Sequence, residues 1–106
     1  MKPNKTQKKY AAFFQALSHR RRQMICDILL KSGAKGLTFG ELQRQSGLQA
    51  STLSHHLWFM YRGGILRRKQ KGRETVLSVD FAFLRRVSLG YGERALVNTT
   101  PALSPA

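Results

Sequence analysis

The chain has 106 residues, which is enough for one small domain and too few for a second independent core. Lysine and arginine number 19 against 5 aspartate and glutamate, so the formal net charge is +14. A surface of this charge repels itself unless it meets a polyanion, which points to nucleic acid or an anionic membrane surface. No apolar run approaches the roughly 20 residues that cross a bilayer, and no signal core follows the basic N-terminus. We therefore expect a cytoplasmic, nucleoid-associated protein without a membrane partner.

Two helices are predicted before the first glycine-rich turn. In the first, over about residues 5–17, apolar positions recur at helical spacing and several are aromatic. These aromatic side chains either pack within one chain or meet a second subunit. The second helix, over about residues 19–32, has Ser18 as its expected N-cap and ends at Gly33. Three arginines at positions 20–22 lie in its first turn, where the helix dipole disfavours positive charge, so they either lie near phosphates or form a solvated end.

The pattern that follows is typical of a helix-turn-helix. Leu37 is expected to contribute a short strand. Thr38 and Glu41 match a capping box, which predicts a short helix over residues 39–46. Gly47 then begins a tight turn into another helix, and two helices joined in this way form the DNA-binding motif.

The helix after this turn, which ends at Gly63-Gly64, carries the residues that we expect to read DNA. Its core-facing stripe, at helical spacing, comprises Leu53, His56, Leu57 and Met60. The opposite side begins with short polar groups, which can approach base edges in a major groove. The base-reading candidates are Gln49, Ser51, Thr52, Ser54 and His55. Trp58, on the exposed side, either packs beneath the following hairpin, which we favour, or stacks near the sugar-phosphate backbone.

A strongly basic hairpin follows the double glycine. Apolar and β-branched residues at 65–69 and 74–79 flank a turn at Lys71-Gly72, which predicts two antiparallel strands. The phosphate-binding candidates on this hairpin are Arg67, Arg68, Lys69, Lys71 and Arg73. Basic loops are often only solvated, but this one directly follows a recognition-type helix, so a DNA contact is the preferred interpretation.

The chain ends with one more helix and a polar tail. Asp80 is the expected N-cap of a helix over about residues 81–89, whose apolar side must be covered by its own domain or by another subunit. Residues 98–106 have the composition of a disordered tail. The expected organisation is a single domain over residues 1–97 followed by that tail.

The order and spacing of these segments resemble a known family. Ala-Leu-Ser-His-Arg at 16–20, Gly-Leu-Gln-Ala-Ser-Thr-Leu-Ser-His-His-Leu at 47–57 and Lys-Gly-Arg at 71–73 resemble the ArsR/SmtB family of bacterial winged-helix repressors. The resemblance covers residues 13–89 and is most specific at 51–57. It implies a mainly α (α+β) winged helix-turn-helix of about five helices with a two-stranded β-hairpin wing. It also implies a homodimer, built through the first and last helices, that binds operator DNA and releases it when an inducer binds.

The chain departs from the family where metal ions bind. The thiolate positions of the family correspond to Thr38 and Gly40, neither of which supplies a thiolate. The family's other site uses carboxylates and histidines on the last helix, where this chain offers Asp80 and Glu93 but no histidine. We therefore expect no metal ion and no cofactor.

Two further side-chain groups invite chemical interpretations. His55 and His56 are neighbours on one helix, about 100° apart, so they are poorly placed to chelate one ion. We expect His55 to face DNA and His56 to lie at the rim of the core. Cys26 is the only cysteine, so no intrachain disulfide can form. A buried inert thiol is the preferred role for Cys26, and a redox sensor is the alternative.

The sequence thus predicts a dimeric, sequence-specific repressor that binds double-stranded DNA at an inverted repeat. It does not identify an inducer. The acidic residues are scattered, and no nucleophile–base or paired-carboxylate arrangement is present, so we expect no enzyme. The charge alone also permits a nonspecific nucleoid-associated or RNA-binding winged helix. A third hypothesis is a module whose basic faces dock an acidic protein.

Overall fold

The computed structural model describes the backbone of residues 1–103 and the side chains of residues 1–97. The helices are α1 (Lys5–Gln15), α2 (Arg20–Ser32), α3 (Phe39–Ser46), α4 (Ala50–Arg62) and α5 (Phe81–Leu103), with a 3-10 turn, η1 (Gly33–Lys35). The strands are β1 (Leu37–Thr38), β2 (Leu66–Lys71) and β3 (Glu74–Val79), which form an antiparallel sheet in the order β1-β3-β2. The predicted winged helix-turn-helix is confirmed. The predicted two-stranded hairpin gains β1 as a third, short strand.

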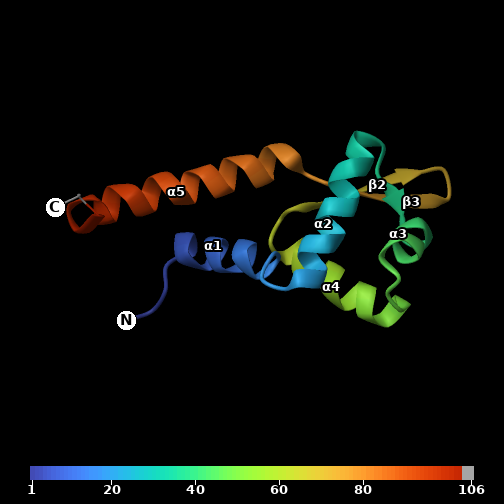
Figure 1. The fold of residues 1–106 in the computed structure, drawn as a ribbon, viewed down its shortest axis with the longest axis horizontal. Helices are drawn as coiled ribbons and strands as arrows, with labels where there is room; N and C mark the ends of the chain where they lie inside the picture. The colour runs from blue at the N-terminus through green and yellow to red at the C-terminus, as the bar shows by residue number, and fades with distance from the viewer. Residues whose placement is uncertain (104–106) are drawn as a thin grey trace.

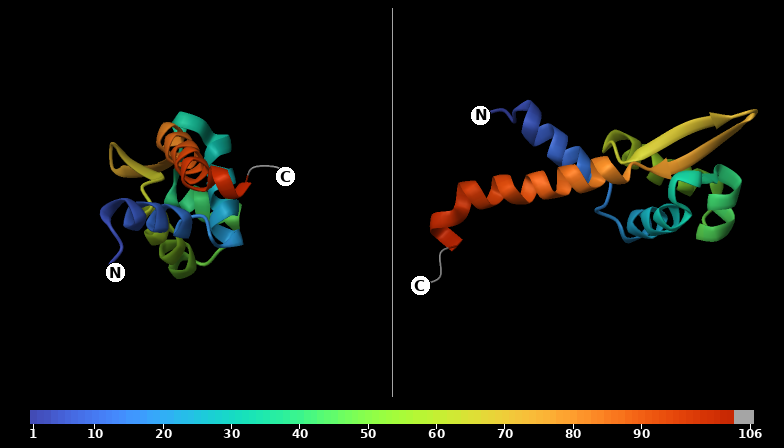
Figure 2. Two further views of the ribbon diagram at one scale, coloured as in Figure 1. Left: turned by 90° about the vertical axis from the view of Figure 1, so that its left-hand side faces the viewer. Right: turned by 90° about the horizontal axis from the view of Figure 1, so that it is seen from above.

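The molecule is elongated. Its radius of gyration is 16.3 Å, against about 13 Å for a compact domain of this size, and its longest extent is 55 Å. α5 and the wing, formed by β2 and β3, project toward opposite ends of a central helical body, as Figures 1 and 2 show. The helix-turn-helix and the wing therefore lie at one end, and the long last helix at the other.

Local capping chemistry fixes the helix-turn-helix. Thr38 and Glu41 form the predicted capping box, and α3 ends at Gly47, whose φ of 70° is left-handed. The N-cap prediction for α2 was wrong by one residue. His19 is the cap, and its Nδ1 accepts a hydrogen bond from the Arg21 backbone N–H at 3.0 Å. Ser18 instead donates its hydroxyl to the Gln15 carbonyl.

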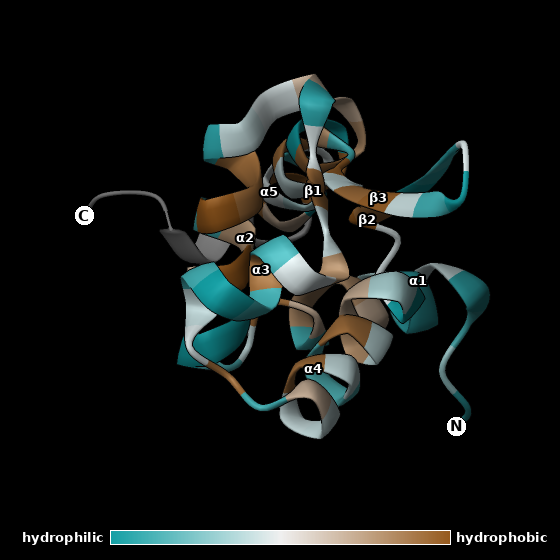
Figure 3. Cartoon of the chain, turned by 90° about the vertical axis from the view of Figure 1, so that its right-hand side faces the viewer, coloured by the Kyte–Doolittle hydropathy of each residue, from teal (hydrophilic) through white to brown (hydrophobic). Residues whose placement is uncertain are grey.

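The core is drawn from every α-helix and from the base of the wing. Its largest fully buried side chains are Phe13, Ile25, Leu29, Leu42, Leu53, Met60 and Ile65. Leu77 of β3 and Val87 of α5 complete it. Figure 3 shows that the wing is apolar at its base, where it joins the core, and polar at its far end.

The expected end of the last helix was wrong. Asp80 caps α5 as predicted, accepting a hydrogen bond from the Phe83 backbone N–H at 3.0 Å. The helix then continues past residue 89 to Leu103. The ring of Tyr91 lies 5.1 Å from that of Tyr10 and 4.8 Å from that of Phe14, so packing against α1 outweighs the poor helix propensity of the nearby glycines. The expected tail is thus helical as far as Leu103, and its residues 104–106 lie outside the described part of the chain.

A buried arginine fixes α4 against the body. Arg22 is 7% exposed, and its Nε donates to His56 Nδ1 at 3.2 Å. Its Nη1 donates to the Gln15 carbonyl and to the Ser18 hydroxyl, and its guanidinium lies 4.1 Å from the centre of the Phe59 ring. This one side chain joins the end of α1, the start of α2 and the middle of α4.

The arginines at 20–22 therefore do not act as one cluster. Arg22 is structural, whereas Arg20 and Arg21 are exposed. His56 lies deeper than the expected rim position, with 5% of its surface exposed. Burial lowers the pKa of His56, and the neighbouring His19 and Arg22 lower it further. The neutral ring is the form that accepts the Arg22 hydrogen bond.

The pH dependence of stability tests this pair. Because folding lowers the pKa of His56 from 6.5, His56 of the unfolded chain becomes protonated below about pH 6.5, whereas His56 of the folded chain is protonated only at a lower pH. The contribution of His56 to the free energy of unfolding is complete above that pH and is lost as pH falls through the folded-state pKa. Urea midpoints measured from about pH 8 to 5 should therefore fall more steeply for the native chain than for His56→Gln. Equal pH dependence of the two proteins would contradict this assignment.

The close crossing of α1 over the end of α4 gives a second test. A Cβ at Gly63 would lie 2.5 Å from Ala16 Cβ and 2.8 Å from the Ala12 carbonyl oxygen, closer than packed atoms allow. Gly63→Ala should lower the free energy of unfolding by about 1–3 kcal/mol through overpacking. Gly40→Ala is the matched control, since its new methyl would meet only Arg44 at 3.7 Å. Urea unfolding of the two variants should separate them; equal midpoints would mean that the α1–α4 crossing tolerates a side chain.

Candidate nucleic-acid interface

α4 is buried along its apolar face only, so its polar face is exposed to solvent. Leu53, His56, Leu57 and Met60 are all buried, as their spacing predicts. The five base-reading candidates lie on or before the first turns of α4. Gln49, Ser51, Ser54 and His55 are exposed, and Thr52 is half-buried. The structure thus makes the whole predicted set accessible along one edge.

The start of α2 lies beside the start of α4. His19, Arg21, Ser51, Thr52 and His55 line one shallow depression on the surface. The ring of His19, at the start of α2, lies 4.8 Å from that of His56, in the middle of α4, so the two helices are in direct contact here. His19 and Arg21 are therefore neighbours of the recognition edge that sequence reasoning did not include in its DNA-binding set. The only sequence signal was the arginine cluster itself.

The five basic candidates of the wing are all exposed, but the strand pleat divides them between two faces. Arg68 pairs with Leu77 on the core-facing side, and its guanidinium lies 4.8 Å from the centre of the Tyr61 ring. Arg67 is on the opposite face, where its Nε lies 3.7 Å from an Asp80 carboxylate oxygen. Lys69 and Lys71 share that opposite face, and Arg73 lies in the turn.

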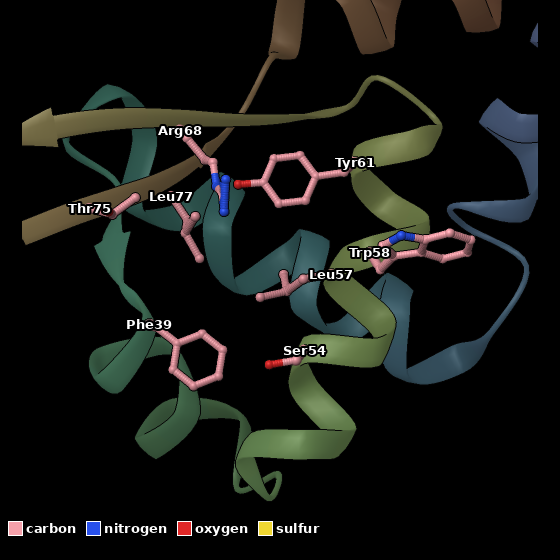
Figure 4. A pocket seen from close by; sticks show the side chains of 8 residues that line it. All are labelled: Phe39, Ser54, Leu57, Trp58, Tyr61, Arg68, Thr75 and Leu77. Carbon is pink, nitrogen blue, oxygen red and sulfur yellow. The ribbon is translucent and has the colours of Figure 1, made fainter.

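A hollow of about 340 Å³ separates α4 from the wing (Figure 4). Trp58 lies at its rim with 52% of its surface exposed, and the guanidinium of Arg62 is 4.9 Å from the centre of the Trp58 ring. In Figure 4 the indole ring points away from the hollow and from the wing, and it lies 4.9 Å from the Phe59 ring of the same helix, so the expected packing beneath the wing is wrong. Ser54 and Arg68, one from each predicted DNA-binding group, also line the hollow.

Cys26 is 4% exposed within the core. Burial, with a smaller effect from Asp27, raises the pKa of its thiol, which keeps the sulfur protonated and weakly nucleophilic. This environment favours the inert role. Among the described residues, no group of three or more histidine, cysteine, aspartate and glutamate side chains is placed to hold a metal ion.

No helix in the described residues has the length and apolar character needed to span a membrane.

Comparisons with known proteins place this architecture in a family. No protein-family model matches the chain. The HTH-type transcriptional regulator YgaV of Escherichia coli (strain K12) is 36% identical over 69 residues, which cover 65% of this chain and 68% of that protein. The crystal structure of a predicted DNA-binding transcriptional regulator from E. coli is 30% identical, with a TM-score of 0.59, over 79% of this chain and 87% of that one.

A third comparison concerns the fold alone. The homodimeric winged helix-turn-helix domain of a possible ArsR-family regulator from Mycobacterium bovis is 18% identical, with a TM-score of 0.65. The aligned region covers 87% of this chain and 83% of that domain. All three are named as transcriptional regulators, the E. coli structure as a predicted one and the M. bovis domain as a possible one. With this fold, this recognition helix and these relatives, the chain belongs to the ArsR family of winged helix-turn-helix, DNA-binding transcriptional regulators.

Proposed function

We propose that the chain is a homodimeric repressor that binds one inverted-repeat operator and reads its sequence with α4. The observation that carries this proposal is the exposed polar edge at the start of α4, bordered by basic side chains. Nonspecific binding to a polyanion needs only the charge. An accessible row of hydrogen-bonding groups on a helix that fits the major groove indicates base reading.

Direct base contacts are assigned to Gln49, Ser51, Thr52, Ser54 and His55. Amide, hydroxyl and imidazole groups both donate and accept hydrogen bonds, which suits the mixed donor and acceptor pattern of the major groove. His55 is the most informative member, because its ring stacks edge-on against Phe59 with 5.1 Å between ring centres. A ring held in this way can reach a base with little loss of side-chain entropy.

Phosphate contacts are assigned to the wing residues Arg67, Arg68, Lys69, Lys71 and Arg73. Arg21, exposed beside the start of α4, is added to them. The wing and the start of α2 thereby border α4 with positive charge. Contacts of this kind set the position of the protein on the duplex without reading its sequence.

The dimer is assigned to α1 and α5. Phe14, Leu89 and Tyr91 expose 41%, 56% and 39% of their surfaces, and Phe14 and Tyr91 are in ring contact. An apolar surface of this kind on a projecting helix is typical of a subunit interface. The M. bovis domain with this fold is itself homodimeric. Two-fold symmetry would place the two copies of α4 about one DNA turn, ~34 Å, apart.

Release from DNA is proposed not to depend on a transition metal. Thr38 takes a family thiolate position, and its hydroxyl is already engaged with the Glu41 carboxylate at 2.9 Å. Gly40 offers no ligand at all. The net charge of +14 leaves one competing function, a nonspecific nucleoid-associated or RNA-binding protein, which the following experiment separates from a repressor.

The test begins with duplexes selected from a random library by the full chain, followed by affinity measurements on the selected duplex and on a shuffled one. His55→Ala should cost about 1–3 kcal/mol on the selected duplex and little on the shuffled one, because only a base contact is lost. Arg73→Ala should weaken both duplexes alike and lower the slope of log K against log salt by about 0.9.

Each variant is the control for the other, since one removes a base contact and the other a phosphate contact. Equal binding of selected and shuffled duplexes by the native chain would refute the repressor and leave the nonspecific role. Preference for RNA of the same sequence would do so as well.

A further inference from the structure

We propose that the hollow between α4 and the wing binds a small aromatic carboxylate, and that its occupation competes with DNA. The competition rests on the proposed DNA-binding function, whereas binding of the carboxylate does not. The hollow is enclosed by elements far apart in the sequence, as Figure 4 shows, with α3 and α4 on two sides and the wing on a third.

The size and lining of the hollow suit a flat apolar body. Its volume of about 340 Å³ falls within the range of small-molecule sites. Leu57 and Leu77 form an apolar floor and are 5% exposed each, and Phe39 supplies an aromatic wall. Trp58 borders the hollow, but its ring points away from it (Figure 4). Aromatic side chains favour an aromatic ligand through edge-to-face contact.

Two polar groups at the wing side of the hollow specify an anion. The Arg68 guanidinium lies 4.8 Å from the Tyr61 ring centre, so a fixed positive charge borders the apolar walls. The Tyr61 hydroxyl is buried and has no hydrogen-bond partner among the described residues. Burial raises the pKa of Tyr61, with Arg68 opposing this weakly, so the phenol remains a proton donor at neutral pH.

A carboxylate satisfies both groups at once. It accepts the paired N–H groups of Arg68 and the O–H of Tyr61, and charge-assisted bonds of this type are the stronger kind. A neutral ligand of the same shape would leave the guanidinium without a countercharge. The chemistry of the hollow therefore selects an acid over the corresponding alcohol.

Occupation of the hollow would affect DNA binding through residues already assigned to it. Arg68 would be engaged by the carboxylate instead of by a phosphate, and Ser54, at the edge of the same hollow, would lie next to the ligand. The two ligands would therefore weaken each other reciprocally, as linkage requires.

Trp58 borders the hollow on α4 and is the only tryptophan in the chain, so its emission reports a change at that part of the helix. Titration of the full chain with benzoate, in the absence of DNA, should change the Trp58 emission saturably, with a Kd on the order of 1 mM. Benzyl alcohol, the neutral probe, should bind at least about tenfold more weakly. Arg68→Gln should weaken benzoate binding by about 10–100-fold.

Two further variants distinguish the loss of a benzoate contact from the loss of the folded structure. Tyr61→Phe removes only the hydroxyl and should weaken benzoate several-fold while leaving the helical circular dichroism unchanged. Arg67→Gln removes the same charge from the opposite face of β2 and should leave benzoate affinity unchanged. Absence of a saturable signal, equal binding of the two probes, or equal benzoate affinity in Arg68→Gln and Arg67→Gln would overturn the site.

A second titration tests the competition. Benzoate at ten times its Kd should weaken binding of the selected duplex about tenfold if the two ligands exclude each other. Unchanged DNA affinity with the site saturated would overturn the competition. A chain that binds benzoate as expected but does not discriminate between duplexes would keep the site and refute the repressor, so the two failures are distinguishable.

Discussion

The placement of the recognition helix depends on Arg22, a charged side chain inside the body. A buried guanidinium is costly unless its donors are satisfied. Here the partners are uncharged: a ring nitrogen of His56, the Gln15 carbonyl, the Ser18 hydroxyl and the face of Phe59. Arg22 lies on α2, and its partners come from the end of α1, the turn after α1 and α4, so the charge is stable only when α1, α2 and α4 have their native arrangement. That arrangement determines the direction in which the polar edge of α4 points.

Apart from Arg22, the basic side chains of the described residues are exposed or half-buried. No ion pair with a carboxylate neutralises Arg22 among the contacts of the described residues, and Arg67 with Asp80 is an exposed pair of modest strength. The excess of basic side chains thus stays available to a polyanion. In the proposed function, charge brings the protein to DNA and makes binding salt-dependent, whereas the hydrogen-bonding groups of α4 select the sequence. Affinity and specificity would then be carried by different side chains.

Local chemistry made much of this fold predictable from the sequence. The capping box of Thr38 and Glu41, the glycine at 47 and the apolar stripe of α4 depend on residues a few positions apart, and all three appear as expected. The accessibility of the five base-reading candidates follows from the same stripe. Features that depend on contacts between residues far apart in the sequence were harder to predict.

Apart from the N-cap of α2, which a local hydrogen bond places at His19, the features that were not predicted depend on tertiary contacts. α5 extends because Tyr91 meets Tyr10 and Phe14 of α1, which no local pattern reveals. Arg22 is buried because His56 lies opposite it, 34 positions along the chain. The wing cations alternate between two faces because of the strand pleat, but which face meets the core follows from the pairing of β2 with β3, which places Arg68 opposite the buried Leu77.

The central claim is that α4 acts in symmetric pairs held together by α1 and α5. Sedimentation of the native chain and two variants tests it most directly. Leu89→Glu places a charge on an α5 side chain that is 56% exposed. Leu30→Glu, at a 36% exposed position on α2, is the matched control. The account predicts that the native chain and Leu30→Glu sediment as dimers, while Leu89→Glu is a folded monomer that no longer binds the selected duplex tightly. A monomeric native chain that still binds that duplex, or a Leu89→Glu protein that remains dimeric, would contradict it.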